Sequence, residues 1–122
     1  MKIRVGVIFG GESVEHEVSI ISAMQAINKL DLEKYEVVPI YITKDREWYT
    51  GEMLRDIEVY QDLSLIKRYA DNVVLYCKDG SYVLQKKNGL FKRVVKEIDI
   101  AFPIVHGTNV EDGVLQGYLQ TI

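Results

Sequence analysis

The sequence lacks the features that would point to a secreted, membrane-bound or nucleic-acid-binding protein. It has one cysteine in 122 residues, Cys77, which excludes an internal disulfide framework and fits a reducing compartment. No apolar stretch approaches the roughly 18 residues of a membrane span, and the N-terminus leads into an apolar run without the pattern of a signal peptide. The net charge is −3 and basic residues are not clustered, so we expect no nucleic-acid or membrane partner. These absences predict a cytoplasmic protein.

Two common phosphate-binding motifs are absent as well. Gly6, Gly10 and Gly11 do not have the spacing of GxGxxG, and no segment matches GxxxxGK[ST]. A dinucleotide-binding or P-loop protein is therefore disfavoured. The chain also has no internal repeat and no linker, and 48% hydrophobic with 27% charged residues is the balance of a globular protein. We expect residues 1–122 to form one domain.

The first recognisable pattern along the chain is a strand, a helix and a second strand. Residues 3–9 are apolar and end at a glycine pair, which predicts a strand buried on both faces. A helix over about 15–30 should place its apolar stripe on the sheet, and residues 36–42 predict a second strand. Pro39 removes one ladder donor and favours an edge or near-edge position or a local bulge in that strand. The residues assigned to the apolar stripe are Val18, Ile20, Ile21, Met24, Ile27 and Leu30.

Residues 47–96 have a different pattern and read as an insertion. A short strand at 47–49 and one or two short helices over 53–70 precede three β-prone runs at 73–77, 82–86 and 90–95. Asp79-Gly80 and Asn88-Gly89 separate these runs, and both dipeptides favour hairpin turns. We expect an antiparallel meander beside the parallel sheet, with support or oligomer contact as its role. Cys77 lies in an apolar run and is expected to be buried.

Residues 98–105 predict a return to the parallel sheet, followed by a helix over about 112–122. The predicted fold is three-layer α/β with a Rossmann-like parallel sheet. Its strand order is 2-1-3, counting the runs 3–9, 36–42 and 98–105, with the meander inserted. The sequence stops on an apolar helix without a terminating signal, so we expect it to be a piece of a longer protein.

Two turns collect the residues that could carry chemistry, one after each neighbouring parallel strand. In the first turn, Gly10 and Gly11 let the backbone approach a ligand, and the helix start that follows favours anions. Glu15 either gains from the helix dipole or faces the cleft to bind a substrate ammonium. Ser13 is either an N-cap or a ligand contact. Glu12 and Glu17 read as solvated acids, Ser19 as a first-turn hydroxyl that could also meet a ligand, and His16 as a surface or packing residue.

The second turn begins at His106, where the chain leaves a buried strand. His106 is either a structural histidine or part of a site in the crevice. Metal binding by His106 with Glu111 or Asp112 is disfavoured, because no second histidine lies at ligand spacing. We therefore expect no metal site here.

The two turns resemble the motifs of one enzyme family. The run Gly10-Gly11-Glu12-Ser13-Val14-Glu15-His16-Glu17-Val18-Ser19 is similar to GGxSxExxVS, which opens D-alanine–D-alanine ligases. His106-Gly107, Glu111-Asp112-Gly113 and Gln116-Gly117 resemble the HGxxGEDGxxQG motif of the same family. The resemblance extends along the whole chain but covers only the N-terminal domain of these enzymes. One departure is Val110, where the family has glycine, so the second turn would follow another path if that glycine needs a positive φ.

The resemblance implies an ATP-grasp ligase that uses ATP and Mg²⁺ to join two D-alanines for peptidoglycan. Glu15 would bind the ammonium of the first D-alanine and help to orient catalytic groups of the next domain. Val18 would line the pocket for its methyl group, and His106 would place its polar end. Gly10 and Gly11 would border the same pocket, with Ser13 beside them.

The residues that bind ATP and Mg²⁺ in this family lie on later domains, which this sequence does not contain. We therefore expect the fragment to bind no cofactor, to bind D-alanine weakly and to be inactive alone. Its expected partners are D-alanine, the missing central and C-terminal domains and, because such enzymes are commonly dimers, a second copy. Two alternatives stay open: the same domain of a D-alanine–D-lactate or D-serine ligase, or a stand-alone flavodoxin-like binding module.

Overall fold

The computed structural model describes residues 2–11, 16–88 and 93–104. The described strands are β1 (Ile3–Gly10), β2 (Tyr35–Ile42), β3 (Trp48–Thr50), β4 (Asp71–Lys78), β5 (Ser81–Lys86), β6 (Val94–Ile98) and β7 (Ile100–Ile104). The described helices are α1 (His16–Lys29), α2 (Leu63–Tyr69) and the short 3-10 helices η1 (Glu52–Arg55) and η2 (Ile57–Gln61). None of these helices combines the length and apolar character needed to cross a bilayer.

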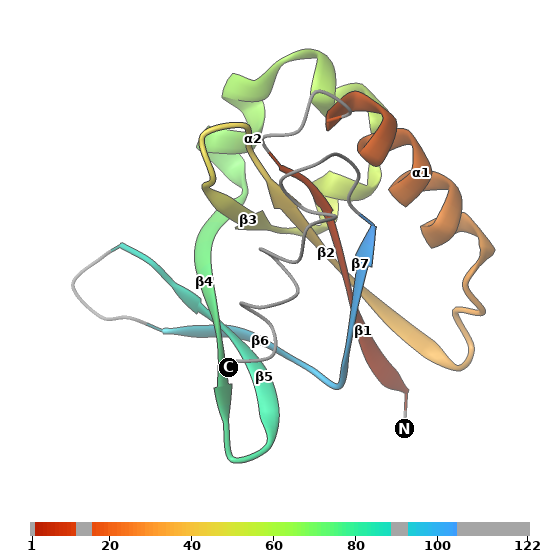
Figure 1. Cartoon of the computed structure of the whole chain (residues 1–122), viewed down its shortest axis with the longest axis vertical. Helices are drawn as coiled ribbons and strands as arrows, with labels where there is room; N and C mark the ends of the chain where they lie inside the picture. Colours follow the sequence, from red (N-terminus) through yellow and green to blue (C-terminus); the bar gives the residue numbers. More distant parts are fainter. Residues whose placement is uncertain (1, 12–15, 89–92, 105–122) are drawn as a thin grey trace.

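The described strands form one sheet in the order β6-β5-β4-β3-β2-β1-β7 (Figure 1). β1 lies between β2 and β7 and pairs with both in parallel, so Val5 is opposite both Val37 and Ile100. This arrangement confirms the predicted order 2-1-3. It also brings the carboxyl ends of β1 and β7 to the same edge of the sheet.

The inserted segment joins the same sheet through β3. β3 pairs antiparallel with both β2 and β4, and β4, β5 and β6 follow as the predicted meander. The turn between β4 and β5 has positive φ at Asp79 (53°) and Gly80 (82°), as the Asp-Gly hairpin signal predicts. The last strand of the meander, predicted over 90–95, is β6 in the described residues, and residues 89–92 lie outside the described ranges.

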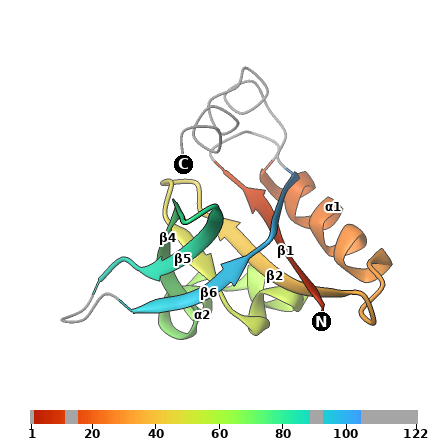
Figure 2. The same ribbon diagram turned by 90° about the horizontal axis from the view of Figure 1, so that it is seen from below.

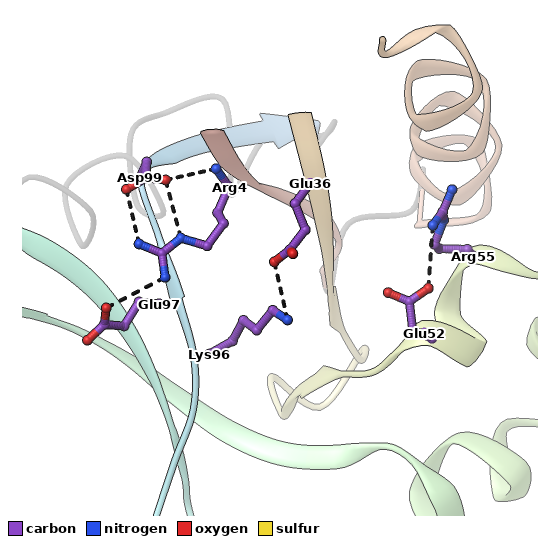
Figure 3. Close-up of polar contacts among 7 residues, drawn as sticks. All are labelled: Arg4, Glu36, Glu52, Arg55, Lys96, Glu97 and Asp99. Carbon is purple, nitrogen blue, oxygen red and sulfur yellow. Dashed lines mark hydrogen bonds and ion pairs between the residues drawn. The ribbon is translucent and has the colours of Figure 1, made fainter. Parts of the chain in front are cut away.

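The predicted strand over 98–105 is two strands joined at Asp99. Ile98 belongs to β6, which pairs with β5, and Ile100 begins β7, which pairs with β1. Asp99 makes the corner, where its amide donates to the Arg4 carbonyl (2.8 Å) and its carboxylate accepts from the Arg4 amide (2.8 Å). Figure 3 shows the Arg4 guanidinium between Asp99 and Glu97.

Two apolar clusters lie on opposite faces of β1. Val5, Val7 and Phe9 face the helices and pack in one cluster with residues of α1, η1 and α2. Ile8 points to the other face and packs in the second cluster with residues of β4, β5 and β6, among them Leu84. Figure 2 shows the same separation, with α1 on one side of β1 and the meander on the other. The expected final helix over 112–122 lies outside the described residues.

Three expectations about single residues were wrong. Val18 and Ile21 are 51% and 53% exposed, because α1 buries the side that carries Ser19, Ile20 and Ala23. Cys77 is exposed near the end of β4, beyond the part of the strand that packs in the core.

Pro39 lies in an interior strand rather than at an edge. It is tolerated there because β3 pairs with β2 only from Ile40 onward, so β3 makes no backbone pair at Pro39. The Thr50 hydroxyl donates to the Pro39 carbonyl at 2.7 Å instead.

Candidate functional site

The candidate site lies at the edge of the sheet where β1, β2 and β7 end and α1 begins. Gly10 has a φ of +97°, which favours glycine. A Cβ at this position would lie 2.2 Å from the Ile42 carbonyl oxygen, so the close approach of β1 to β2 also requires glycine. Gly11 continues with the same φ, and its amide donates to the Ile42 carbonyl at 2.8 Å. The first turn is thus held close to the end of β2.

Ser19 connects the ends of the two neighbouring strands. Its side chain is fully buried at the start of α1. The Gly10 amide donates to the Ser19 Oγ at 2.9 Å, and the Ser19 hydroxyl donates to the Ile104 carbonyl. One hydroxyl therefore links β1, α1 and β7 at the edge where the two motif segments follow these strands in the sequence.

His16 fixes the first turn from the other side. Its ring is buried, with Nδ1 hydrogen-bonded to the Gly11 carbonyl and Nε2 lying 2.6 Å from the Tyr41 hydroxyl. Because a carbonyl only accepts, Nδ1 carries the proton, and in the neutral ring Nε2 accepts from Tyr41. His16 therefore has a packing and hydrogen-bonding role, which is one of the two roles expected for it.

The hydroxyl of Tyr41 stays protonated in this environment. Burial, with smaller contributions from the charges of Glu17 and Asp45, raises the pKa of Tyr41 to about 12. The Tyr41 ring packs against Phe9 (5.7 Å between centroids) and Tyr60 (5.1 Å). An aromatic cluster thus packs around the tyrosine that is hydrogen-bonded to His16.

Of the residues predicted for the site, the described ones are Gly10, Gly11 and Val18. The two glycines are buried in the turn, and Val18 is half-exposed in the first turn of α1. The predicted residues Ser13, Glu15 and His106 lie outside the described residues, as do Glu12, Val110, Glu111 and Asp112. In the sequence, Glu15 directly precedes His16 of α1, and His106 comes two residues after Ile104 of β7.

The described charge near the first turn is a surface pair. Glu17 lies 3.2 Å from Lys44, and both side chains are more than 60% exposed. A backbone hydrogen bond and Lys44 lower the pKa of Glu17, as expected for a solvated first-turn acid. Among the described residues, no three His, Cys, Asp or Glu side chains gather closely enough to hold a metal ion.

Sequence reasoning did not identify the roles of Ser19 and Tyr41. Ser19 stands in the first motif, but its link to Ile104 joins positions 85 residues apart and has no local signal. A small polar residue on the buried side of an apolar stripe is the only clue that the sequence offers, since buried hydroxyls need partners. Tyr41 appears in sequence simply as part of an apolar strand.

The fold and this edge define a class of protein: an α/β domain whose glycine turn and neighbouring parallel strands meet at the edge where sheets of this kind commonly bind ligands. The chain belongs to the family described as "D-ala D-ala ligase N-terminus", whose model matches residues 4–122. The resemblance seen in the two motifs is thereby confirmed.

Curated relatives and solved structures agree with this family. The chain is 42% identical over 115 residues to D-alanine–D-alanine ligase of Thermosipho melanesiensis and 44% identical over 119 residues to that of Natranaerobius thermophilus. These matches cover 94% and 97% of this chain but 31% of each relative, so the chain spans about a third of their length.

Two solved structures of ligases are similar to nearly the whole chain. VanG D-Ala:D-Ser ligase from Enterococcus faecalis has a TM-score of 0.74 at 31% identity, covering 98% of this chain and 34% of that structure. The D-alanine–D-alanine ligase from Coxiella burnetii has a TM-score of 0.71 at 31% identity, covering 98% and 33%.

Proposed function

We propose that this chain is the N-terminal domain of a cytoplasmic, ATP-dependent ligase that joins two D-alanines into D-alanyl-D-alanine. The product would serve peptidoglycan synthesis and thus the cell wall and cell shape. In this proposal the enzyme is an ATP-grasp ligase, and ATP and Mg²⁺ bind to segments of the relatives that this chain does not match. Its partners would be those segments and, in a homodimer, a second copy.

The contribution of this chain would be part of the site for the first D-alanine. The Glu15 carboxylate would bind the substrate ammonium and help to orient catalytic groups on the adjoining domain. Val18 would contact the methyl group, and His106 would place the polar end of the substrate. Gly10, Gly11 and Ser13 would border the pocket. Positioning of two small substrates can supply a large part of the rate acceleration.

One observation supports the proposal most. β1 and β7 are parallel neighbours that end at the same edge, and Ser19 hydrogen-bonds to both ends. The motif segments that carry Glu15 and His106 follow these ends directly in the sequence. Because residues 1–122 would supply only some of the walls of the pocket, we expect them alone to bind D-alanine weakly and not to hydrolyse ATP.

The test compares Glu15→Gln with wild type in the full-length ligase and measures dipeptide synthesis. The variant keeps the size of the side chain but loses the charge that would hold the ammonium. A hydrogen bond to a charged group contributes about 1.5–3 kcal/mol, so we expect kcat/KM for the first D-alanine to fall roughly 10- to 100-fold.

Glu17→Gln is the matched control, because Glu17 lies two residues further along the sequence and, among the described residues, forms its ion pair with exposed Lys44. It should change kcat/KM less than about two-fold, as expected for a surface pair. Equal kcat/KM values for wild type and Glu15→Gln would refute the assigned role of Glu15.

A second candidate is a ligase that adds D-serine or D-lactate to D-alanine. This candidate is supported by the similarity to VanG, a D-Ala:D-Ser ligase. Offering D-alanine with D-alanine, D-serine or D-lactate to the full-length enzyme separates the two, since the preferred second substrate appears directly in the product.

A further inference from the structure

The Ser19 hydroxyl has an unusual pair of partners for a residue in a helix. Serine in a helix commonly donates to the backbone carbonyl four residues earlier. Ser19 instead donates to the carbonyl of Ile104 and accepts from the amide of Gly10. Its side chain has no exposed surface, and both partners are backbone groups of neighbouring strands.

These two bonds join the described ends of β1 and β7. Phe9 and Ile104 are a pair in the register of these strands, and Gly10 follows Phe9. Ser19 therefore links both strands to α1 at this edge of the sheet.

We propose that Ser19 is a positioning residue for the first amino-acid substrate. By holding Gly10, Ile104 and the start of α1 in one hydrogen-bonded unit, it sets the placement of Glu15, which directly precedes α1 in the sequence. This inference rests on the proposed function of Glu15. Ser19 does not contact the substrate itself, because its oxygen is buried and uses both a donor and an acceptor within the fold.

The first arm of the test measures Ser19→Ala in the full-length ligase. The expected result is a rise of about ten-fold in KM for the first D-alanine, because small displacements of positioning groups weaken binding strongly. KM for ATP should change by less than about two-fold. The melting temperature is recorded for each variant, so that loss of fold is seen separately.

Thr50→Val is the matched control. Thr50 is also buried, and its hydroxyl donates to a strand carbonyl, that of Pro39, at 2.7 Å. This bond lies between β2 and β3, away from the ends of β1 and β7. Thr50→Val should lower the melting temperature while KM for the first D-alanine stays within about two-fold of wild type.

The second arm is a double-mutant cycle of Ser19→Ala with Glu15→Gln. If Ser19 acts by placing Glu15, then Ser19→Ala should have little further effect on KM once the carboxylate is lost. A purely structural role would instead give multiplying effects on KM. Unchanged KM in Ser19→Ala, or effects that multiply, would overturn the positioning role while leaving the proposed function intact. A Glu15→Gln enzyme that behaves like wild type would overturn the proposed function, and the positioning role with it.

Discussion

The chain path at the end of β1 depends on the smallest residue in the first motif. Gly10 has a positive φ and lies against the Ile42 carbonyl, so two separate physical constraints fall on one position. The turn between β4 and β5 contains a glycine, Gly80, to which only one of these two constraints applies. Gly80 also has a positive φ, of +82°, but no atom lies within 4 Å of where its Cβ would be. Substitutions at these two glycines therefore separate the cost of backbone strain from the cost of steric overlap.

We expect Gly10→Ala to destabilise the chain more than Gly80→Ala. A left-handed φ costs a residue with a Cβ about 1–2 kcal/mol, which is the expected loss for Gly80→Ala. Gly10→Ala adds overlap with a backbone oxygen that cannot move away as a flexible side chain could, which costs a further ~1–3 kcal/mol. Urea unfolding of the two variants and the wild type gives both values, and equal losses would contradict the close approach at Gly10.

At the scale of elements, the corner between β6 and β7 is held by charge as well as by backbone pairing. The Asp99 carboxylate accepts from the Arg4 amide and lies 3.3 Å from the Arg4 Nε (Figure 3). These bonds, chiefly the one from the backbone amide, lower the pKa of Asp99 below its ordinary value of 3.8. The ionised carboxylate thus stabilises the corner.

The pH dependence follows from the sign of this shift. Because the pKa of Asp99 is lower in the folded chain, its contribution is fully present above about pH 4 and is lost as the pH falls through the folded-state value. We expect Asp99→Asn to lower the melting temperature by a few degrees at pH 7, and the difference from wild type to shrink as the pH approaches 2. Thermal unfolding followed by circular dichroism over this pH range measures it.

The control is Glu52→Gln, which removes another carboxylate drawn in Figure 3. Glu52 is paired with Arg55 at 3.4 Å one helical turn away, and its side chain is 78% exposed. Such surface pairs contribute little, so this variant should lower the melting temperature at pH 7 less than Asp99→Asn does. A larger effect at Glu52 would show that the corner bonds are unimportant.

The Asp99 corner also shows why sequence predicted some elements better than others. The Asp-Gly turn was predicted because its signal is local: two residues must adopt a positive φ. The break at Asp99 has no such signal, since apolar residues flank it and its cause is Arg4, 95 positions earlier. The exposure of Val18 and Ile21 was missed for a related reason. Apolar spacing predicts that α1 buries its apolar stripe, but α1 also buries the polar residues His16 and Ser19.

At the scale of the whole molecule, the predicted order of the parallel strands is confirmed. The sequence did not show that the inserted meander continues the same hydrogen-bonded sheet. β3 supplies this continuity with three residues. The meander also covers the second face of the parallel strands. The Cδ1 atom of Ile98 in β6 lies 2.5 Å from the position that a Cβ on Gly6 would take. We therefore expect the candidate site edge and the meander to be parts of one folding unit.

One folding unit predicts one unfolding transition, and Leu84→Ala tests it. Leu84 is fully buried in β5 and packs in one cluster with Ile8 of β1 and Ile40 of β2. Its truncation should cost about 2–5 kcal/mol, against less than about 1 kcal/mol for Val74→Ala on the neighbouring strand, where the side chain is 38% exposed. Urea unfolding is followed by the fluorescence of Trp48, the single tryptophan, and by far-ultraviolet circular dichroism. Both probes should shift together in Leu84→Ala, because the cavity in the meander weakens the parallel strands as well. Two separate transitions would instead mean that the meander folds independently of the strands that lead to the candidate site.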